Sequence, residues 1–351
     1  MAERKMRLVA RRAVGSSGVN SIVPLLYPAA KTFDSGLLHV SSGHRLYFEQ
    51  RGTPHGSPVL YLHGGPGAGT QEIECRLFSH LRRAVFLDQR GSGRSRPYAS
   101  LEENNIDALI HDIESLREYL KIDSWQVVGG SWGSTLALAY ALRFPERVLG
   151  LVLSGFFKGT QDAADEFLDS QRHAATRYPF RYKEFSEFGD GSIPLTSRYY
   201  QALSCADTES QEAATKSFMR WDRSLCTPLP TKEFISRVDG EVHELLSLAR
   251  IFFHYYCNDF FLDTPLVDEV GRLRGIPVTV LCGTQDWITP LKYSRELSSA
   301  LPGSKLEIVD GMGHMQFTVD GIPRLIAAIE EQERAFSGIS GRAKRFFSTL
   351  W

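Results

Sequence analysis

The fold is decided by one stretch, Gln126-Val127-Val128-Gly129-Gly130-Ser131-Trp132-Gly133. The segment Gln126–Val128 has the composition of a strand, and the segment Ser134–Phe144 repeats apolar residues at helical spacing until Pro145 ends the pattern. A serine in a GxSxG turn between a strand and a helix projects its hydroxyl above the sheet, and the glycines leave room for that tight geometry. The stretch therefore predicts an α/β fold with Ser131 as the candidate nucleophile.

Short β-rich runs alternate with helical patterns on both sides of this unit, from about residue 36 to 157 and again after residue 277. Such alternation is typical of parallel βαβ units. We expect strands at Val59–Leu62, Ala84–Leu87, Gln126–Val128, Leu149–Leu153, Val278–Leu281 and Lys305–Val309. We expect helices at Asp107–Leu120, Ser134–Phe144, Leu291–Leu301 and Ile322–Phe336.

The interval from about residue 158 to 270 differs from its flanks. It has helical periodicity and many aromatic residues, and it contains no convincing strand. We interpret it as a helical cap inserted into the core. The predicted organisation is an N-terminal basic extension (1–35), the first part of the core (36–157), the cap (158–270), the second part of the core (271–336) and a C-terminal tail (337–351).

The composition argues against several classes of protein. Of the 351 residues, 42% are hydrophobic and 23% are charged, and the formal net charge of −1 gives no strong field for nucleic acid or an anionic membrane. No apolar run approaches the roughly 18 to 20 residues that span a bilayer. The expected partner is therefore a small molecule, and the sequence leaves the oligomeric state open.

Cysteine usage and the N-terminus bear on location. Five scattered cysteines without CxxC spacing predict neither a disulfide framework nor a metal site, which favours a reducing compartment and a cytoplasmic protein. The alternative is an organelle, because a basic start is also typical of a transit peptide. The basic residues concerned are Arg4, Lys5, Arg7, Arg11 and Arg12.

A glycine-rich loop, His63-Gly64-Gly65-Pro66-Gly67, follows the expected strand Val59–Leu62. A tetrahedral oxyanion needs two preorganised N–H donors, and glycines let the backbone approach the substrate. We expect the backbone amides of Gly65 and Trp132 to form the oxyanion hole, and His63 to brace the loop. A second charged loop, Asp88 to Ser95, lacks the lysine of a phosphate-binding loop, and we expect it to act as a scaffold.

An acid and a histidine follow two late strands. Asp286 comes after Val278–Leu281, and His314 comes after Lys305–Val309. The chain order Ser, Asp, His is typical of the α/β-hydrolase fold. We therefore expect a triad in which His314 moves the proton of Ser131 while Asp286 orients the imidazole. The predicted fold is a mostly parallel sheet with helices on both faces and an inserted helical cap, and this chemistry requires neither a cofactor nor a metal.

Three motifs occur in order, HGGPG at 63–67, DQRGSGRS at 88–95 and GGSWGSTLALAYA at 129–141. With them the chain from about residue 36 to 335 resembles the proline iminopeptidases, serine peptidases that release a free N-terminal proline from peptides. The resemblance implies the triad and the oxyanion donors at the positions named above. It also implies a small peptide or amide as substrate.

The resemblance further implies how the substrate is held. The family uses acidic cap residues for the protonated N-terminus, and one of them, in a Trp-Glu pair, is similar to Trp221-Asp222. The other lies in a stretch similar to ARIENHYF, where this chain places Phe252 at the glutamate position. Phe157 matches an aromatic residue of the family's pocket. We therefore expect Trp221, Asp222, Phe157 and Phe252 around the substrate, with one anchor for the amine missing.

The missing anchor leaves alternatives open. Another cap acid, Glu166 or Asp259, would restore the anchor. Without it, the site would suit an amidase or esterase of the same framework that acts on a bulkier hydrophobic aminoacyl amide or ester, as in specialised metabolism. A ligand-sensing protein that keeps the fold with little turnover is a further hypothesis, because fold alone does not imply catalysis.

Overall fold

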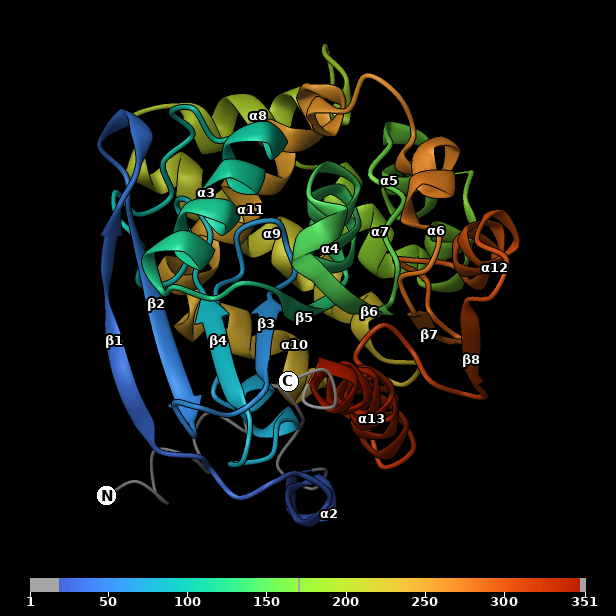
Figure 1. Cartoon of the computed structure of the whole chain (residues 1–351). Coiled ribbons are helices and arrows are strands. Elements are labelled where there is room, and N and C mark those ends of the chain that lie inside the picture. The colour runs from blue at the N-terminus through green and yellow to red at the C-terminus, as the bar shows by residue number, and fades with distance from the viewer. Residues whose placement is uncertain (1–18, 170, 348–351) are drawn as a thin grey trace.

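The computed structural model describes residues 19–169 and 171–347 of the chain. It has a central sheet with helices around it (Figure 1). The basic residues between positions 4 and 12, and with them the transit-peptide hypothesis, lie outside the described residues. In the part of the chain that the structure describes, no helix is long and apolar enough to cross a membrane.

The described residues form one eight-stranded sheet with the order β1-β2-β4-β3-β5-β6-β7-β8 (Figure 1). β2 pairs antiparallel with both β1 and β4, whereas every other pair of neighbours is parallel. The strands are β1 (Thr32–His39), β2 (Arg45–Gly52), β3 (Pro58–Leu62), β4 (Arg83–Leu87), β5 (Trp125–Gly130), β6 (Val148–Ser154), β7 (Val278–Gly283) and β8 (Lys305–Val309).

Both faces of the parallel strands are buried, which explains their nearly continuous apolar sequences. In β3, for example, Leu60 and Leu62 pack with α3 (Ile106–Tyr119) and α4 (Trp132–Arg143), whereas Val59 and Tyr61 belong to a separate apolar cluster with α13 (Gly321–Phe347). Successive side chains of a strand point to opposite faces, so one strand supplies both clusters. A further helix, α12 (Leu291–Ala300), packs beside β7.

The core strands predicted from the sequence are confirmed, with ends that differ by at most two residues. The first two strands were not predicted. β1 alternates exposed with half-buried side chains, and β2 buries the polar side chains of Glu49, Gln50 and Arg51, so neither strand has an apolar pattern. Because β1 begins at Thr32, the expected boundary at residue 36 falls inside a strand. The last helix, α13, continues past its predicted end at Phe336.

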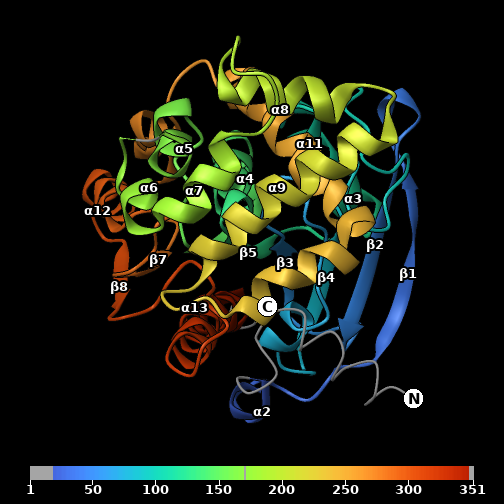
Figure 2. The same cartoon turned by 180° about the vertical axis from the view of Figure 1, so that it is seen from behind.

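Between β6 and β7 the chain forms helices that stack on one another, and Figure 2 shows α8, α9 and α11 crossing this side of the molecule. One of them lies on the glycine-rich loop, where the Ser247 hydroxyl donates a 2.8 Å hydrogen bond to the carbonyl of Gly67. The helices are α5 (Gln161–Leu168), α6 (His173–Arg177), α7 (Pro179–Ser186), α8 (Leu195–Ser204), α9 (Thr208–Cys226), α10 (Lys232–Ser236) and α11 (Val242–Cys257).

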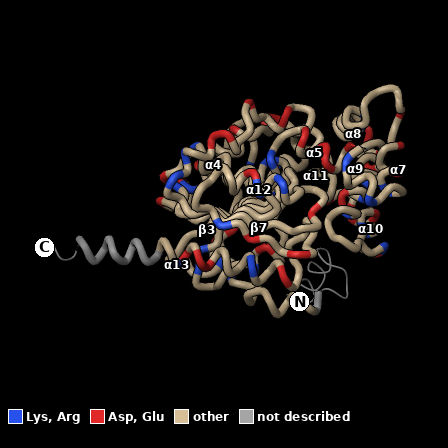
Figure 3. The backbone as a smooth tube through the Cα atoms, turned by 90° about the vertical axis from the view of Figure 1, so that its right-hand side faces the viewer, with Lys and Arg blue, Asp and Glu red and all other residues tan. Residues whose placement is uncertain are grey.

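Charged residues of both signs are distributed over the chain. Figure 3 shows Lys and Arg interspersed with Asp and Glu along the backbone. This distribution agrees with the small net charge of the sequence, −1.

Candidate active site

Ser131 lies on the sharp turn that joins β5 to α4. Its backbone has φ 54° and ψ −125°, a conformation that is strained for a residue with a side chain. The turn is possible because its neighbours are glycines. A Cβ atom on Gly129 would lie 2.1 Å from the carbonyl oxygen of Gly133, and one on Gly133 would lie 2.0 Å from the carbonyl oxygen of Leu62. The GxSxG pattern is therefore required by packing at this turn.

The three residues that chain order pointed to lie together. His314 Nε2 is 3.0 Å from Ser131 Oγ, and His314 Nδ1 is 2.9 Å from Asp286 Oδ2. Asp286 is buried and also accepts hydrogen bonds from the backbone amides of Ile288 and Thr289, at 3.0 and 2.7 Å. These bonds fix the carboxylate, so Nδ1 carries the proton and Nε2 is free to accept the serine proton.

The charges around His314 favour its protonated form. Burial alone would lower the pKa of the imidazole, but the negative charges of Asp286 and then of Asp222 outweigh this effect and raise the pKa above its ordinary value. An imidazolium formed by proton transfer from Ser131 is therefore stabilised in place. The pocket is thus arranged for a histidine that accepts a proton during the reaction.

Among the described residues, the backbone amides of Gly65 and Trp132, which were expected to form the oxyanion hole, have no hydrogen-bond acceptor. Trp132 is the first residue of α4, and the first amides of a helix have no intrahelical partner. Gly65 has φ 120°, and within residues 19–169 and 171–347 its amide donates no hydrogen bond. The glycine before it also matters, since a Cβ atom on Gly64 would lie 3.2 Å from Ser131 Cβ.

His63 orients the peptide group that carries the Gly65 amide. Its Nε2 accepts a hydrogen bond from the Gln89 amide at 3.0 Å, so the ring proton is on Nδ1. Nδ1 lies 2.9 Å from the Gly64 carbonyl oxygen and 3.2 Å from the Gly69 amide; of these two neighbours only the carbonyl can accept the Nδ1 proton. Burial lowers the pKa of His63 and keeps the ring neutral. Because the Gly64 carbonyl and the Gly65 amide belong to one peptide group, holding the first fixes the second.

Gln89 connects the two halves of this arrangement, which the sequence did not reveal. Its Nε2 donates to the carbonyl of His63 at 2.9 Å, and its Oε1 accepts from the indole of Trp132 at 3.0 Å. The side chain is buried, at 3% exposure. One amide group thus links the loop that carries Gly65 to the helix start at Trp132.

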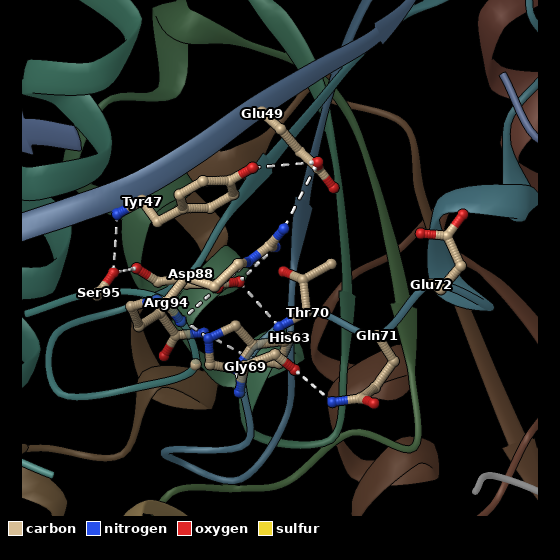
Figure 4. A network of polar contacts seen from close by, with 12 residues as sticks. Tyr47, Glu49, His63, Gly69, Thr70, Gln71, Glu72, Asp88, Arg94 and Ser95 are labelled. Atoms are coloured by element: carbon tan, nitrogen blue, oxygen red, sulfur yellow. Dashed lines mark hydrogen bonds and ion pairs between the residues drawn. The ribbon is translucent and has the colours of Figure 1, made fainter. Parts of the chain in front are cut away.

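The expected scaffold role of the loop from Asp88 to Ser95 is confirmed (Figure 4). Asp88 accepts hydrogen bonds from the Thr70 amide at 2.9 Å and from the Arg94 guanidinium at 2.8 Å. Burial opposes ionisation of Asp88, but Arg94 outweighs it and lowers the pKa of the carboxyl below its ordinary value. Arg94 also lies over the ring of Tyr47, 3.8 Å from its centre. The network holds the chain that follows the glycine-rich loop.

A cavity of about 270 Å³ opens beside Ser131 and His314. The helices between β6 and β7 supply one wall, and the sheet and its loops supply the other. The first wall includes Phe167, Phe218, Asp222, Leu248 and Phe252, and the second includes Tyr61, Gly64, Gly65, Glu74 and Gln316. The cavity is therefore apolar on the helical side, apart from Asp222.

Of the four residues expected around the substrate, Asp222 and Phe252 line this cavity, and Phe157 and Trp221 do not. The Trp221 indole donates to the carbonyl of Phe167 at 2.7 Å and is buried. Adjacent residues of a helix point about 100° apart, so Asp222 and Trp221 face different sides of α9. Phe157 packs against Phe260 at a ring distance of 5.0 Å. Trp221 thus contacts Phe167, which lines the cavity, whereas the ring partner of Phe157 does not line it.

Asp222 is the acid that the helical wall offers. Burial raises the pKa of its carboxyl, and the nearby His314 opposes this effect. The thiol of Cys226 lies 3.6 Å from Asp222 Oδ2. At the position of the missing glutamate, Phe252 stacks with Phe218 at a ring distance of 5.2 Å and contributes apolar surface.

Neither alternative cap acid lines the cavity. Glu166 is held by Lys292 at 2.6 Å and Arg172 at 3.1 Å, and Asp259 belongs to the short helix η6 (Asp259–Phe261). The second acid in the cavity is instead Glu74, from the short helix η3 (Glu74–Leu77) of the core. No motif in the sequence marked it, because its orientation depends on tertiary contacts.

Comparisons with known proteins agree with this geometry. The family model of the alpha/beta hydrolase fold matches residues 57–320. A proline iminopeptidase from Arabidopsis thaliana is 39% identical over 319 residues, which cover 89% of this chain and 83% of that protein. One from Neisseria meningitidis serogroup B is 38% identical over 312 residues, which cover 87% and 98%.

A solved structure shows the same fold. The proline iminopeptidase-related protein from Thermus thermophilus has a TM-score of 0.56 and 23% identity, and the match covers 87% of this chain and 98% of that chain. The family model and the two relatives span most of the chain, and the residues that the family model matches include Ser131, Asp286 and His314. The chain therefore belongs to the α/β hydrolases and, within them, to the proline iminopeptidase family.

Proposed function

We propose that this protein is a serine aminopeptidase that releases an N-terminal proline, or a similar residue, from peptides or amides through an acyl-enzyme. One observation carries the proposal: the carboxylate of Asp222 shares a single small cavity with Ser131 and His314. A carboxylate in the same cavity as the nucleophile suits a substrate whose ammonium group lies next to the scissile carbonyl. The relatives named proline iminopeptidase support the same activity.

Acylation begins with proton transfer. His314 Nε2 takes the proton of Ser131 as Oγ attacks the carbonyl carbon, and Asp286 stabilises the imidazolium through Nδ1. The negative charge on the carbonyl oxygen is met by the amides of Gly65 and Trp132 and by the positive end of α4. His314 then returns its proton to the leaving nitrogen, and the C–N bond breaks.

Deacylation repeats these steps with water as the nucleophile. His314 takes a proton from water, the hydroxide adds to the ester carbonyl, and Ser131 leaves with the proton that His314 returns. The free amino acid is the second product. No other group is required for the balance of atoms and charges.

The helical wall would select the acyl part of the substrate. The ammonium group pairs with Asp222, and its charge favours the ionised form of a carboxyl whose pKa burial has raised. The ring of proline, or another apolar side chain, packs against Phe167, Phe218 and Phe252. We infer that residues 158–270 act as a cap that supplies this wall over a core formed by residues 36–157 and 271–336.

The state of the cysteines fits a reducing environment. The cysteines of the sequence, Cys75, Cys205, Cys226, Cys257 and Cys282, are all free thiols. This agrees with action in a compartment such as the cytoplasm.

The test compares three substrates with the wild type and Ser131→Ala. The substrates are proline 2-naphthylamide, its N-acetylated form and a simple acyl ester. We expect serine-dependent cleavage of the free prolyl amide and little cleavage of the acetylated form. Cleavage of the ester or of the blocked amide alone would overturn the proposal and point to the amidase or esterase alternative.

A further inference from the structure

The wall of the cavity opposite the cap holds a cluster of polar groups that the chemistry above does not use. The Tyr61 hydroxyl donates to Glu74 Oε1 at 2.7 Å, and the Gln71 amide donates to Glu74 Oε2 at 2.6 Å. Gln316 lies beside them: its Nε2 is 2.7 Å, and the Tyr61 hydroxyl is 3.7 Å, from where a Cβ atom on Gly130 would be. The cluster therefore adjoins the residue that precedes the nucleophile.

This polar wall presents acceptors that have no cation of their own. Among the ion pairs of the described residues, none involves Glu74. The Oε1 atom of Gln316 is buried and has no hydrogen-bond partner within the described part of the chain. An acceptor left unpaired in a buried wall is costly, unless a ligand supplies the donor. The wall is therefore complementary to a group with hydrogen-bond donors or positive charge.

The directions of the substrate around Ser131 decide which part meets this wall. The carbonyl oxygen points to the amides of Gly65 and Trp132, and the ammonium group points to Asp222 in the cap. The leaving nitrogen must lie at His314 Nε2, which protonates it. Two residues after His314, Gln316 lines the same cavity and lies with the Tyr61 hydroxyl next to Gly130, whereas the Met315 amide donates to the carbonyl of Cys226 on the cap side. The leaving part of the substrate therefore extends along the polar wall.

We propose that Glu74, with Gln316 beside it, forms a subsite for the leaving residue and selects peptides whose second residue is cationic, such as lysine or arginine. The inference rests on the proposed aminopeptidase function and deepens it. A lysine or arginine side chain supplies a positive charge to pair with the Glu74 carboxylate and a hydrogen-bond donor for Gln316 Oε1. An acidic second residue would instead be repelled.

The ionisation of Glu74 sets the conditions for the test. Burial raises the pKa of Glu74 to about 7, against the opposing hydrogen bonds from Gln71 and Tyr61, and the nearby charge of Asp88 raises it further. At pH 8 the carboxyl is mostly ionised even without a ligand. A bound cation would lower its pKa again and add to the preference.

The experiment measures kcat/KM at pH 8 for three dipeptide amides, Pro-Lys, Pro-norleucine and Pro-Glu. All three form the same prolyl acyl-enzyme, so differences in kcat/KM report on the leaving residue during binding and acylation. For the wild type we expect the lysine peptide to be preferred over the glutamate peptide by roughly tenfold or more, as for a charge-assisted contact in a partly buried site. For Glu74→Gln we expect that ratio to fall to within about threefold of one.

The matched control is Glu72→Gln, two positions before Glu74 in the sequence; Figure 4 shows the Glu72 side chain. Glu72 pairs with Arg51 at 2.7 Å and does not line the cavity, so its variant should keep the wild-type ratio. Gln316→Met, which keeps the size but removes the acceptor, should reduce the ratio less than Glu74→Gln does. Gln316→Met also tests the proposal if Glu74→Gln does not fold, because an unchanged lysine-to-glutamate ratio in Gln316→Met would then overturn it.

Two further outcomes would overturn the proposal. An unchanged lysine-to-glutamate ratio in Glu74→Gln would mean that Glu74 only braces Tyr61 and Gln71. An equal loss of kcat/KM for all three peptides would mean that Glu74 binds the N-terminal ammonium instead. Proline 2-naphthylamide distinguishes failure of the subsite proposal from failure of the proposed function. If the wild type does not cleave it, both proposals fail. If the wild type cleaves it but the lysine-to-glutamate ratio is unchanged in Glu74→Gln, only the subsite proposal fails.

Discussion

The hydroxyl oxygen of Ser131 lies 3.0 Å from Nε2 of His314, across 183 positions of sequence. The two residues follow β5 and β8, and Asp286 follows β7 between them in chain order. Because these strands are parallel members of one sheet, their carboxyl ends meet at the same edge. The distance is within reach for proton transfer. The predictions below depend on this arrangement and on the groups that orient it.

Asp286→Asn should leave the fold intact and lower kcat by about 10⁴-fold, as the loss of the carboxylate does in other serine triads. Asparagine keeps the shape but neither stabilises the imidazolium nor fixes the tautomer of His314. The measurement is kcat on proline 2-naphthylamide, with circular dichroism to verify folding. Asp310→Asn is the matched control, because Asp310 is exposed and accepts a hydrogen bond from the hydroxyl of Thr284 at 3.0 Å. A loss of less than tenfold in Asp286→Asn would contradict the assignment of Asp286 to the triad.

Gln89→Leu should lower kcat by about ten- to a hundredfold, less than the roughly 10²- to 10³-fold loss expected when an oxyanion donor is removed outright. The substitution breaks the link between His63 and Trp132 and leaves the indole N–H buried without an acceptor. KM should change little, because the contacts of the ground-state substrate are kept. Gln201→Leu, at an exposed position of α8, is the control. A variant that raises KM and keeps kcat would show that Gln89 does not position the oxyanion donors.

The acid limb of the pH profile should depend on Asp222. The general base must be neutral, so kcat/KM falls as the pH drops through the pKa of His314, which lies above its ordinary value. Removal of a negative charge disfavours the imidazolium. Asp222→Asn should therefore lower the pKa of His314 and move the acid limb to lower pH. The readout is the position of the limb rather than its height, and a limb that stays in place would show that Asp222 does not act on His314.

The order of residues along the chain predicted much of this site, because the position of the site depends on the topology of the sheet. Ser131, Asp286 and His314 were located from their positions after strands, and these residues do lie within hydrogen-bond distance. Side-chain direction was harder to predict. Trp221 was expected beside its neighbour Asp222, but the helix turns it into the interior. A resemblance between sequences does not show which of two adjacent residues faces a cavity.

The residues that sequence reasoning missed share a dependence on distant contacts. Glu74 faces the cavity because Tyr61 on β3 and the amide of Gln71 hold its carboxyl. Gln89 was included only as part of a charged loop, and its role depends on the indole of Trp132, 43 positions later. Neither contact leaves a periodic pattern in the chain. Such residues are found only once the elements have been assembled.

The central claim is that Asp222 holds the free N-terminus of a prolyl substrate next to Ser131. The most direct measurement is the ratio of kcat/KM for proline 2-naphthylamide to that for its N-acetylated form, in the wild type and in Asp222→Asn. Asp239→Asn is the control, since Asp239 is exposed and pairs with Arg220 outside the cavity. The account predicts that the wild type and Asp239→Asn strongly prefer the free amine, and that Asp222→Asn loses roughly ten- to a hundredfold of that preference. A preference that is equally strong in Asp222→Asn, or a wild type that cleaves both substrates equally well, would contradict it.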